Sequence, residues 1–312
     1  MSGSAVSINK IIQNGLSMLY LDEINLDNFF LVEGYTDRIF YMRFLHNNKY
    51  QIFFKDKNEK KQVKEIVLKY FLKGKNIYGI IDPDYNNSDN IEPNIRNRIH
   101  VIDANSLETL LVKYSDENHN VANAIANFDK LLRKGKKEIL TRGQKNYCKI
   151  TDEVLKWAFF IGSIRELNAS NEKYRLNFRK TKENSCFYLK YVNENSNHKK
   201  EFNREAYLID LLNESRYKDE IKKGIKEYNE KDVWNICQGH DIIDFIECLN
   251  KNLNYSETIV GEMHKNREPK TTILDWEYKL LNAFDITNFH GSPLQKWFDE
   301  INSKVTDCII SR

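Results

Sequence analysis

The sequence predicts an α/β protein in which a mostly parallel sheet is followed by a mainly α-helical region. The first third of the 312-residue chain alternates short β-type runs with helical periods, and the links between them are short. From about residue 116 the β-type runs become rare and helical periods dominate. We therefore expect an N-terminal segment at 1–26, a sheet domain at 27–115 and a mainly helical C-terminal region at 116–312.

Four strands are predicted in the sheet domain, in the runs NFFLVEG (28–34), YQIFFK (50–55), NIYGIIDPD (76–84) and RIHVID (98–103). Helices are expected at 36–47, 59–74 and 105–114. Thr36 is the expected N-cap of the first helix, and Asn105 or Ser106 that of the third. The second helix ends at Gly74 and carries apolar residues at i, i+3 and i+4 spacing: Val63, Ile66, Val67, Tyr70 and Phe71.

The C-terminal region is predicted to contain helices around 121–134, 151–167, 204–228, 241–253, 273–284 and 293–304. The last of these has a well-defined start, because Ser292-Pro293 followed by Gln295 combines a proline at N1 with a capping-box pair. The segment 174–200 is expected to form either a hairpin or an ordered loop.

The composition is that of a globular protein, with 41% hydrophobic and 30% charged residues. No apolar run approaches the ~18 residues that a membrane-spanning helix needs, and the first residues lack the pattern of a signal peptide, so a cytoplasmic location is expected. The five cysteines are widely spaced and form no C-x-x-C pair, which argues against a disulfide framework and against a zinc ribbon.

Carboxylates follow the predicted strands at the points where the strands end. Glu33 follows the first strand, Asp82 and Asp84 follow the third, Asp103 follows the fourth, and Glu108 lies one turn into the next helix. The C-terminal ends of parallel strands converge on one crevice, where ligands bind. Because Mg²⁺ and Mn²⁺ prefer oxygen ligands, these acids are candidate ligands of one or two such ions.

Each of these acids also has a structural explanation. An aspartate after a strand is most often a turn or helix-cap residue, and Asp103 before Ala-Asn-Ser fits a cap equally well. Glutamate is a poorer turn residue, however, and Asp82-Pro83-Asp84 supplies two carboxylates at one strand end. The combination in one β-α-β series favours a metal site.

Glutamate-glycine after the first strand and Asp-x-Asp after a later strand resemble the Toprim domain, a Rossmann-like, Mg²⁺-dependent fold. The segments VEGYTDRIFYMRFL, GIIDPDYN and IDANSLETLLV are most similar to the stand-alone Toprim nucleases encoded beside ABC-type ATPases, related to OLD enzymes. Among these, the chain most resembles the Toprim effector nucleases of the PARIS anti-phage defence systems. NICQGHDIIDFI resembles a Gly-[Lys/His]-Asp segment in the helical part of that family.

The resemblance implies roles for the acids. Glu33 is the expected metal ligand or proton-transferring acid, Asp82 and Asp84 are expected Mg²⁺ ligands, and Glu108 is a second-metal or orienting acid. Asp103 is a further candidate ligand that a cap explains as well. In such a site the metal activates the attacking water and neutralises developing charge during phosphodiester hydrolysis.

His240 is a further candidate catalytic residue. In the run CQGHDIIDFI it could contact the scissile phosphate or protonate the leaving group, and a capping turn with a partly exposed histidine is the equally weighted alternative. Cys237-x-x-His240 has the spacing of half a zinc site, but no second pair matches it, so zinc is rejected.

Basic residues are concentrated in two segments. Residues 129–149 carry eight Lys or Arg against two acids, and residues 174–191 interleave cations with aromatic rings. Such cations can bind phosphate, and the rings can stack on unpaired bases, unless the cations form a solvated face and the rings belong to the core. The candidate nucleic-acid-binding residues are Lys136, Lys137, Arg142, Arg175, Arg179 and Lys180.

The expected function is therefore a Mg²⁺- or Mn²⁺-dependent Toprim endonuclease. The resemblance implies host tRNA as substrate, an anti-phage abortive-infection role, restraint by an ABC-type ATPase partner and a homodimer as the active form. The chain has no G-x-x-x-x-G-K-[ST] motif and no G-x-G-x-x-G after the first strand, so it should not itself hydrolyse ATP or bind a dinucleotide. Two alternatives stay open: an OLD-like Toprim DNA nickase, and a non-catalytic regulatory binding module.

Overall fold

The computed structural model describes residues 28–43, 51–54, 60–85, 91–114, 140–178, 188–194, 200–245, 248, 281, 284 and 286–310. The chain divides into two compact units, and each is described by itself. The first unit comprises Met1–Pro83, Asn87–Leu107 and Asp285–Arg312, and the second comprises Asp84–Asn86 and Glu108–Phe284.

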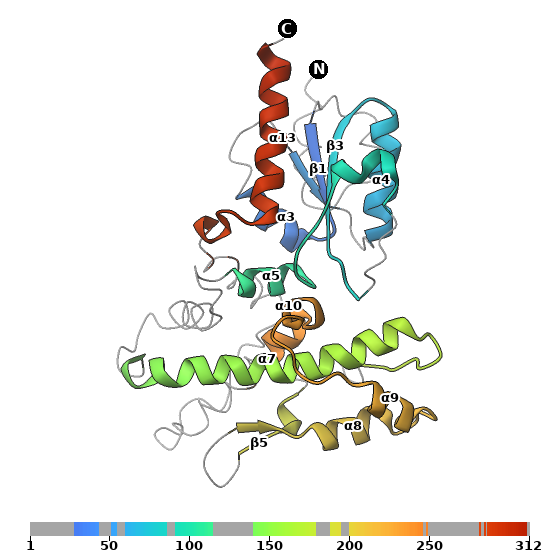
Figure 1. Cartoon of the computed structure of the whole chain (residues 1–312), viewed down its shortest axis with the longest axis vertical. Coiled ribbons are helices and arrows are strands. Elements are labelled where there is room, and N and C mark those ends of the chain that lie inside the picture. Colours follow the sequence, from blue (N-terminus) through green and yellow to red (C-terminus); the bar gives the residue numbers. More distant parts are fainter. Residues whose placement is uncertain are drawn as a thin grey trace, which may run out of the picture. The chain divides into compact units, whose positions relative to one another are not determined.

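A four-stranded sheet forms the centre of the first unit (Figure 1). Its strands are β1 (Asn28–Val32), β2 (Gln51–Phe54), β3 (Asn76–Ile81) and β4 (Ile99–Val101), in the order β2-β1-β3-β4. All three pairings are parallel. The prediction of an α/β protein with a parallel sheet is therefore confirmed, and the four predicted strands lie where the sequence indicated.

Helix α4 (Lys60–Leu72) covers one face of this sheet. It buries Val63, Ile66, Val67 and Tyr70 against the strand residues that point to that face, Phe29, Leu31, Ile77 and Ile81 among them. The helix ends as predicted at Gly74, whose backbone has φ = 75°. The Lys75 N–H donates to the Tyr70 carbonyl and the Gly74 N–H to the Phe71 carbonyl, which is the hydrogen-bond pattern of a Schellman cap.

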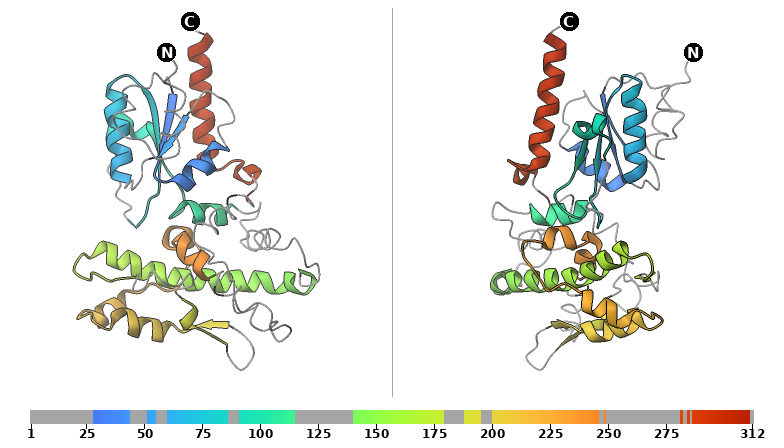
Figure 2. Two further views of the ribbon diagram at one scale, coloured as in Figure 1. Left: turned by 180° about the vertical axis from the view of Figure 1, so that it is seen from behind. Right: turned by 45° about the vertical axis from the view of Figure 1, so that its right-hand side comes forward.

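The opposite face is covered by α13 (Pro293–Ile310), near the end of the chain (Figures 1 and 2). Because side chains alternate along a strand, Phe30 and Tyr78 point away from α4. The Phe30 ring lies 5.8 Å from that of Trp297 and 5.5 Å from that of Phe298, and the Tyr78 ring lies 6.0 Å from Trp297. The predicted start of α13 is confirmed, since the Gln295 N–H donates to Ser292 Oγ at 3.1 Å.

Helix α3 (Tyr35–Met42) follows β1 and begins one residue earlier than predicted. Its N-cap is Gly34, which has extended backbone angles and no side-chain cap, and the Gly34 carbonyl accepts the Arg38 N–H at 3.2 Å. The expected N-cap at Thr36 is therefore wrong. Strand β1 ends at Val32 and α3 begins at Tyr35, so the helix starts before Thr36 could cap it. The 3₁₀ helices η1 (Pro93–Arg98) and η3 (Ile286–Phe289) complete the described elements of this unit.

The second unit contains the long helix α7 (Leu140–Ser170), α8 (Arg204–Leu212), α9 (Lys218–Gly224) and α10 (Val233–Ile236). It also contains helix α5 (Leu107–Lys113) from its second residue onward. Residues 239–245 form a further helical segment. Strands β5 (Val192–Glu194) and β6 (Lys200–Phe202) pair antiparallel. The segment 174–200, for which a hairpin and a loop were both possible, thus contributes one strand and the start of another.

The helix predicted at 204–228 is wrong as a single element. The chain leaves the helix after Leu212, and the Ser215 N–H returns to the Leu212 carbonyl at 2.9 Å. Tyr217 then packs on Tyr174, with ring centroids 5.5 Å apart, and Glu220 accepts the Tyr174 hydroxyl at 2.8 Å. These tertiary contacts set the direction of α9, and no proline marks the break in the sequence.

The helix predicted at 151–167 is confirmed as the middle of the longer α7. The helix predicted at 241–253 starts two residues early, and of residues 246–253 only Cys248 belongs to the described part of the chain. The helix predicted at 121–134 lies outside that part, as does 273–284 except for Leu281 and Phe284. The mainly helical nature of the whole C-terminal region therefore stays a prediction.

The two units differ from the domain boundaries drawn from the sequence. Residues 285–312 belong with the sheet, because α13 packs on it, although they were assigned to the C-terminal region. Glu108 onward belongs to the second unit, although the sheet domain was extended to residue 115.

Candidate metal and phosphodiester site

Two carboxylate residues meet at the C-terminal edge of the sheet. Glu33 directly follows β1 and Asp82 directly follows β3, and these strands are parallel neighbours. The backbone N–H of Asp82 donates to Glu33 Oε1 at 2.8 Å, so the Glu33 carboxylate reaches across to the end of the next strand. Strands β1 and β3 are separated in the sequence by α3, β2 and α4. Their parallel pairing brings Glu33 next to the end of β3.

Asp103 comes shortly after β4, the strand next to β3 in the sheet. The Ile102 N–H donates to the Ile81 carbonyl at 3.1 Å, which continues the pairing of β3 with the chain one residue beyond β4. Burial lowers the pKa of the neighbouring His100 to about 4, and the nearby Asp103 carboxylate opposes that shift. His100 is therefore neutral at physiological pH and adds no charge to this edge.

Lys60 holds the turn that follows Asp82. Its Nζ donates to the Pro83 carbonyl at 2.8 Å, so the first residue of α4 is fixed at the same edge of the sheet as Glu33 and Asp82. The chain then passes into the second unit at Asp84, whose backbone is in the left-handed region with φ = 49°. This conformation is uncommon for residues other than glycine and tends to occur at functional turns.

Three of the predicted site residues, Asp84, Glu108 and His240, belong to the second unit. Glu108 is 9% exposed in the first turn of α5, and the hydroxyl of its neighbour Thr109 donates to the Cys237 carbonyl at 3.0 Å. That bond ties α5 to the segment that carries His240, which is half-buried in the first turn of the 239–245 helix. The two predicted motifs around Glu108 and His240 are thus joined through the neighbours of these residues.

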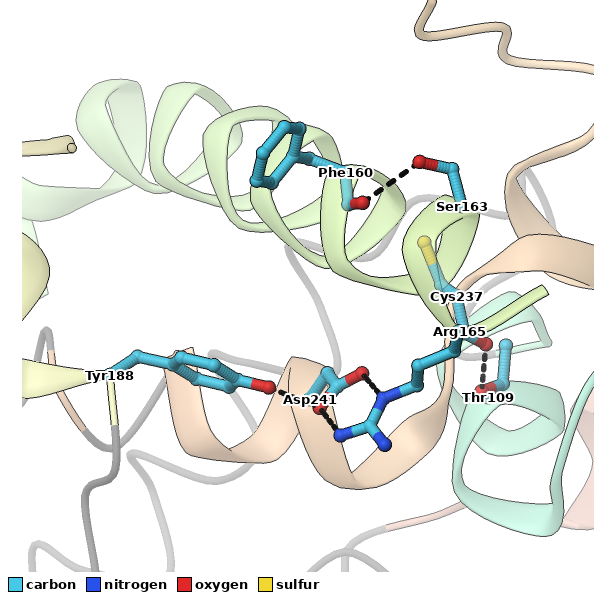
Figure 3. Close-up of polar contacts among 7 residues, drawn as sticks. All are labelled: Thr109, Phe160, Ser163, Arg165, Tyr188, Cys237 and Asp241. Carbon is cyan, nitrogen blue, oxygen red and sulfur yellow. Dashed lines mark hydrogen bonds and ion pairs between the residues drawn. The ribbon is translucent and has the colours of Figure 1, made fainter. Parts of the chain in front are cut away.

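Asp241 is the residue of this segment that sequence reasoning missed. Its carboxylate forms a bidentate pair with Arg165 of α7, at 2.8 Å to Nε and 2.9 Å to Nη2 (Figure 3). The Tyr188 hydroxyl donates to Asp241 Oδ1 at 2.6 Å. The Asp241 side chain is 2% exposed. An arginine within the apolar run WAFFIGSIREL was the available signal that a buried acidic partner exists.

The groups around this ion pair are neutral. Burial raises the pKa of Tyr188, of Tyr85 and of the Cys237 thiol well above their ordinary values, and in each case the Asp241 carboxylate raises it further. Cys237 Sγ lies 3.6 Å from the Leu155 carbonyl. Cys237 is therefore a buried thiol of the helical core.

Three tyrosines of the segment 174–191 belong to the core, and Phe178 is half-buried. Tyr174, Tyr188 and Tyr191 are at most 8% exposed, and Tyr188 stacks on Phe245 with centroids 4.4 Å apart. Phe178 lies under the Arg165 guanidinium. The three buried tyrosine rings are not available to stack on nucleic-acid bases, so the structural alternative holds for them.

Two of the predicted nucleic-acid-binding residues belong to the described part of the chain. Arg175 is exposed, with φ = 49°, and Arg142 lies in the first turn of α7. Lys136, Lys137, Arg179 and Lys180 lie outside the described residues.

The donor set at the sheet edge suits Mg²⁺ or Mn²⁺. Mg²⁺ is usually bound by one or two carboxylates, with water and phosphate oxygens completing its octahedron, and Glu33 and Asp82 supply oxygen ligands only. Among the described residues, no three His, Cys, Asp or Glu side chains group closely enough to form an all-protein metal cage. Glu33, Asp82 and Asp103, the predicted ligands that lie in the first unit, therefore do not form such a group.

Neither a family model nor a curated protein sequence matches this chain. Within the described part of the chain, no helix has both the length and the apolar character needed to cross a membrane.

Proposed function

We propose that the protein is a metal-dependent phosphodiesterase of the Toprim type that cleaves RNA, with host tRNA as substrate. The observation that supports this most directly is the hydrogen bond from the Asp82 N–H to Glu33 Oε1 at 2.8 Å. It holds the Glu33 carboxylate against the end of the neighbouring strand, where Asp82 follows, at the edge of a parallel sheet where ligands bind. Two of the segments that resemble Toprim nucleases, VEGYTDRIFYMRFL and GIIDPDYN, carry these two residues.

In this proposal Glu33 and Asp82 hold the Mg²⁺ or Mn²⁺ ion, with Asp84, Asp103 and Glu108 as further acids of the motif. The bound metal supplies Lewis acidity, which lowers the pKa of a water and offsets the charge that develops on phosphate. The chain itself positions the acids. The Asp82 N–H fixes the Glu33 carboxylate, and Lys60 fixes the Pro83 carbonyl next to Asp82.

The biological setting follows from the resemblance. A nuclease without a nucleotide switch of its own needs external restraint, which an ABC-type ATPase partner provides in this proposal. Cleavage of tRNA would halt growth during phage infection, and the active form would be a homodimer. Co-purification of an ABC-type ATPase with the tagged protein from its native host tests the partnership. If no ATPase is recovered under mild cross-linking, the partnership is refuted.

The reaction is tested by incubating the purified full-length protein with tRNA and, separately, with supercoiled plasmid, each with Mg²⁺ and with EDTA. The proposal predicts tRNA fragments with Mg²⁺ and none with EDTA. Plasmid nicking with intact tRNA would indicate the OLD-like DNA nickase instead. No cleavage of either substrate by a folded, Mg²⁺-loaded protein would support the non-catalytic module.

A further inference from the structure

Three lysines of helix α4, and Lys73 just after its end, lie outside the stripe of residues that packs on the sheet. Around the helix, Val63, Ile66, Val67 and Tyr70 mark the buried side. Lys61, Lys64, Lys69 and Lys73 lie outside that buried stripe; Lys61, Lys69 and Lys73 are exposed and Lys64 is half-buried. We call these four residues the lysine face. The sequence around it, 55–75, contains eight lysines and three acidic residues.

The lysine face lies beside an acidic residue of the same helix. Glu65 is the acidic residue within α4, and it lies 3.9 Å from Lys61 in an i, i+4 pair. The side chains of that pair are 79% and 62% exposed, so the attraction is largely screened by water. The sequence count of eight lysines against three acidic residues between positions 55 and 75 gives this stretch an excess of positive charge.

The cations at the far end of the helix are held over aromatic rings. The Nζ atoms of Lys69 and Lys73 lie 5.2 Å and 5.0 Å from the centroid of the Tyr70 ring. The Arg98 guanidinium of η1 lies 4.8 Å from the Tyr78 ring and 5.4 Å from the Phe71 ring. Arg96 of η1 is exposed. These rings limit the freedom of the cations, which lowers the entropy that ordering them in a complex would cost.

The lysine face begins at the candidate site. Lys60, which precedes Lys61, donates to the carbonyl of Pro83, the residue after Asp82. At ~1.5 Å per residue, α4 then carries its cations over a length of about 20 Å away from that edge. A polyanion that lies along this helix would lead directly to Glu33 and Asp82.

We propose that the lysine face, extended by Arg96 and Arg98, binds the phosphate backbone of the nucleic-acid substrate and guides it to the sheet edge, an inference that rests on the proposed nuclease function. The charge of the face complements a polyanion. It displays cations and no exposed aromatic ring among the described residues of α4, because Tyr70 is buried. The recognition is accordingly of backbone charge and not of base sequence.

The test measures binding apart from cleavage. A full-length Glu33→Gln protein, which still binds but should not cut, is titrated into fluorescently labelled tRNA at several salt concentrations with Mg²⁺ present. In the test variant, Lys61→Gln, Lys69→Gln and Lys73→Gln are combined. The matched control combines Lys218→Gln, Lys222→Gln and Lys223→Gln, three exposed lysines of α9 in the second unit. Thermal unfolding by circular dichroism checks that both variants fold.

The lysine-face variant should bind at least tenfold more weakly than its parent near 0.15 M salt, and its log K against log [salt] slope should be smaller by about 2 to 3, since each lost phosphate contact removes ~0.7–0.9. The α9 control should stay within twofold of the parent. Equal affinity of the lysine-face variant and the control would overturn the inference.

The outcomes separate this inference from the proposed function. Cleavage by the unmodified protein together with unchanged binding by the lysine-face variant leaves the nuclease proposal standing and removes the lysine face from it. If binding depends on the lysine face but the unmodified protein cleaves nothing, the lysine face stands as a nucleic-acid-binding surface and the nuclease proposal is refuted. No measurable binding of tRNA or of plasmid DNA by the Glu33→Gln protein at low salt would also overturn the inference, and would leave an acidic protein as the partner to seek.

Discussion

Glu33 is the residue on which the proposed reaction depends most. Replacing it with glutamine keeps an oxygen that can accept the Asp82 N–H, so the turn after β1 should be retained. The charge that holds the metal or transfers the proton is lost. Cleavage of tRNA by Glu33→Gln should fall by about 10²–10⁴-fold, with the melting temperature within a few degrees of the parent. Single-turnover cleavage and circular dichroism measure the two quantities.

The control for this substitution is Glu205→Gln, which makes the same chemical change at an exposed position of α8. It should cleave like the parent. If Glu33→Gln retained full activity, Glu33 could be neither a metal ligand nor a proton-transferring acid.

Asp241 is a buried acid of the second unit. Its carboxylate is compensated by Arg165 and by the Tyr188 hydroxyl, so removing it leaves a largely buried guanidinium without its partner. Asp241→Ala should lower the free energy of unfolding by about 3–5 kcal/mol. Tyr188→Phe, which removes one hydrogen bond to a charged group, should cost roughly 1.5–3 kcal/mol. Urea denaturation of both variants provides the comparison.

A double variant sharpens this prediction. If Arg165→Met is added to Asp241→Ala, the lone guanidinium is removed, and part of the lost stability should return. Purely additive losses would mean that the two side chains do not interact as a pair in solution.

At the scale of elements, α7 and α10 approach so closely that only glycine fits between them. A Cβ atom built on Gly162 would lie 2.0 Å from the carbonyl oxygen of Ile236. Because that neighbour is backbone, it cannot rotate away. Gly162→Ala should therefore destabilise the protein by about 1–3 kcal/mol or more, although alanine is the better helix former. Chemical denaturation measures the change.

Gly224→Ala is the matched control for this substitution. There the added Cβ would meet the end of the Leu167 side chain at 2.9 Å, and a flexible side chain can shift. The control should cost clearly less than Gly162→Ala. Equal effects at the two positions would show that the contact between α7 and α10 is not as close as described.

At the scale of the whole molecule, the stability of the first unit should depend on His100. Its ring lies 5.1 Å from that of Trp297 on α13, and its Nε2 has no hydrogen-bond partner among the described residues. The folded pKa is lowered by burial to about 4 from 6.5, so the unfolded chain binds the proton more tightly. The stability that neutral His100 provides is complete above pH 6.5 and is lost as the pH falls toward 4.

The corresponding loss is on the order of 3 kcal/mol across that window, at ~1.36 kcal/mol per pKa unit. Urea denaturation of the parent and of His100→Gln between pH 7.5 and 4.5 should give stability differences that shrink as the pH falls. Parallel curves for the two proteins would contradict the prediction. Comparing the two curves cancels the contributions of other titrating groups.

Much of the first unit could be read from local patterns. The runs around Phe29, Phe53, Ile77 and Ile99 are short and apolar, and the period of α4 is unambiguous, so strand and helix assignments there depend on neighbours within a few residues. The second unit was harder because its turns are set by distant contacts. The break between α8 and α9 depends on Tyr217 packing against Tyr174, which no local rule indicates.

By itself the sequence determined the parallel α/β sheet and the presence of carboxylates after its strands, because alternation of strand and helix and the chemistry of single residues are local properties. Only the tertiary structure decided that the Asp82 N–H bonds Glu33, that α13 covers the second face of the sheet, and that Asp241 pairs with Arg165. These are contacts between residues 49 or more positions apart. They are decided by which surfaces bury each other best, and that depends on the whole chain at once.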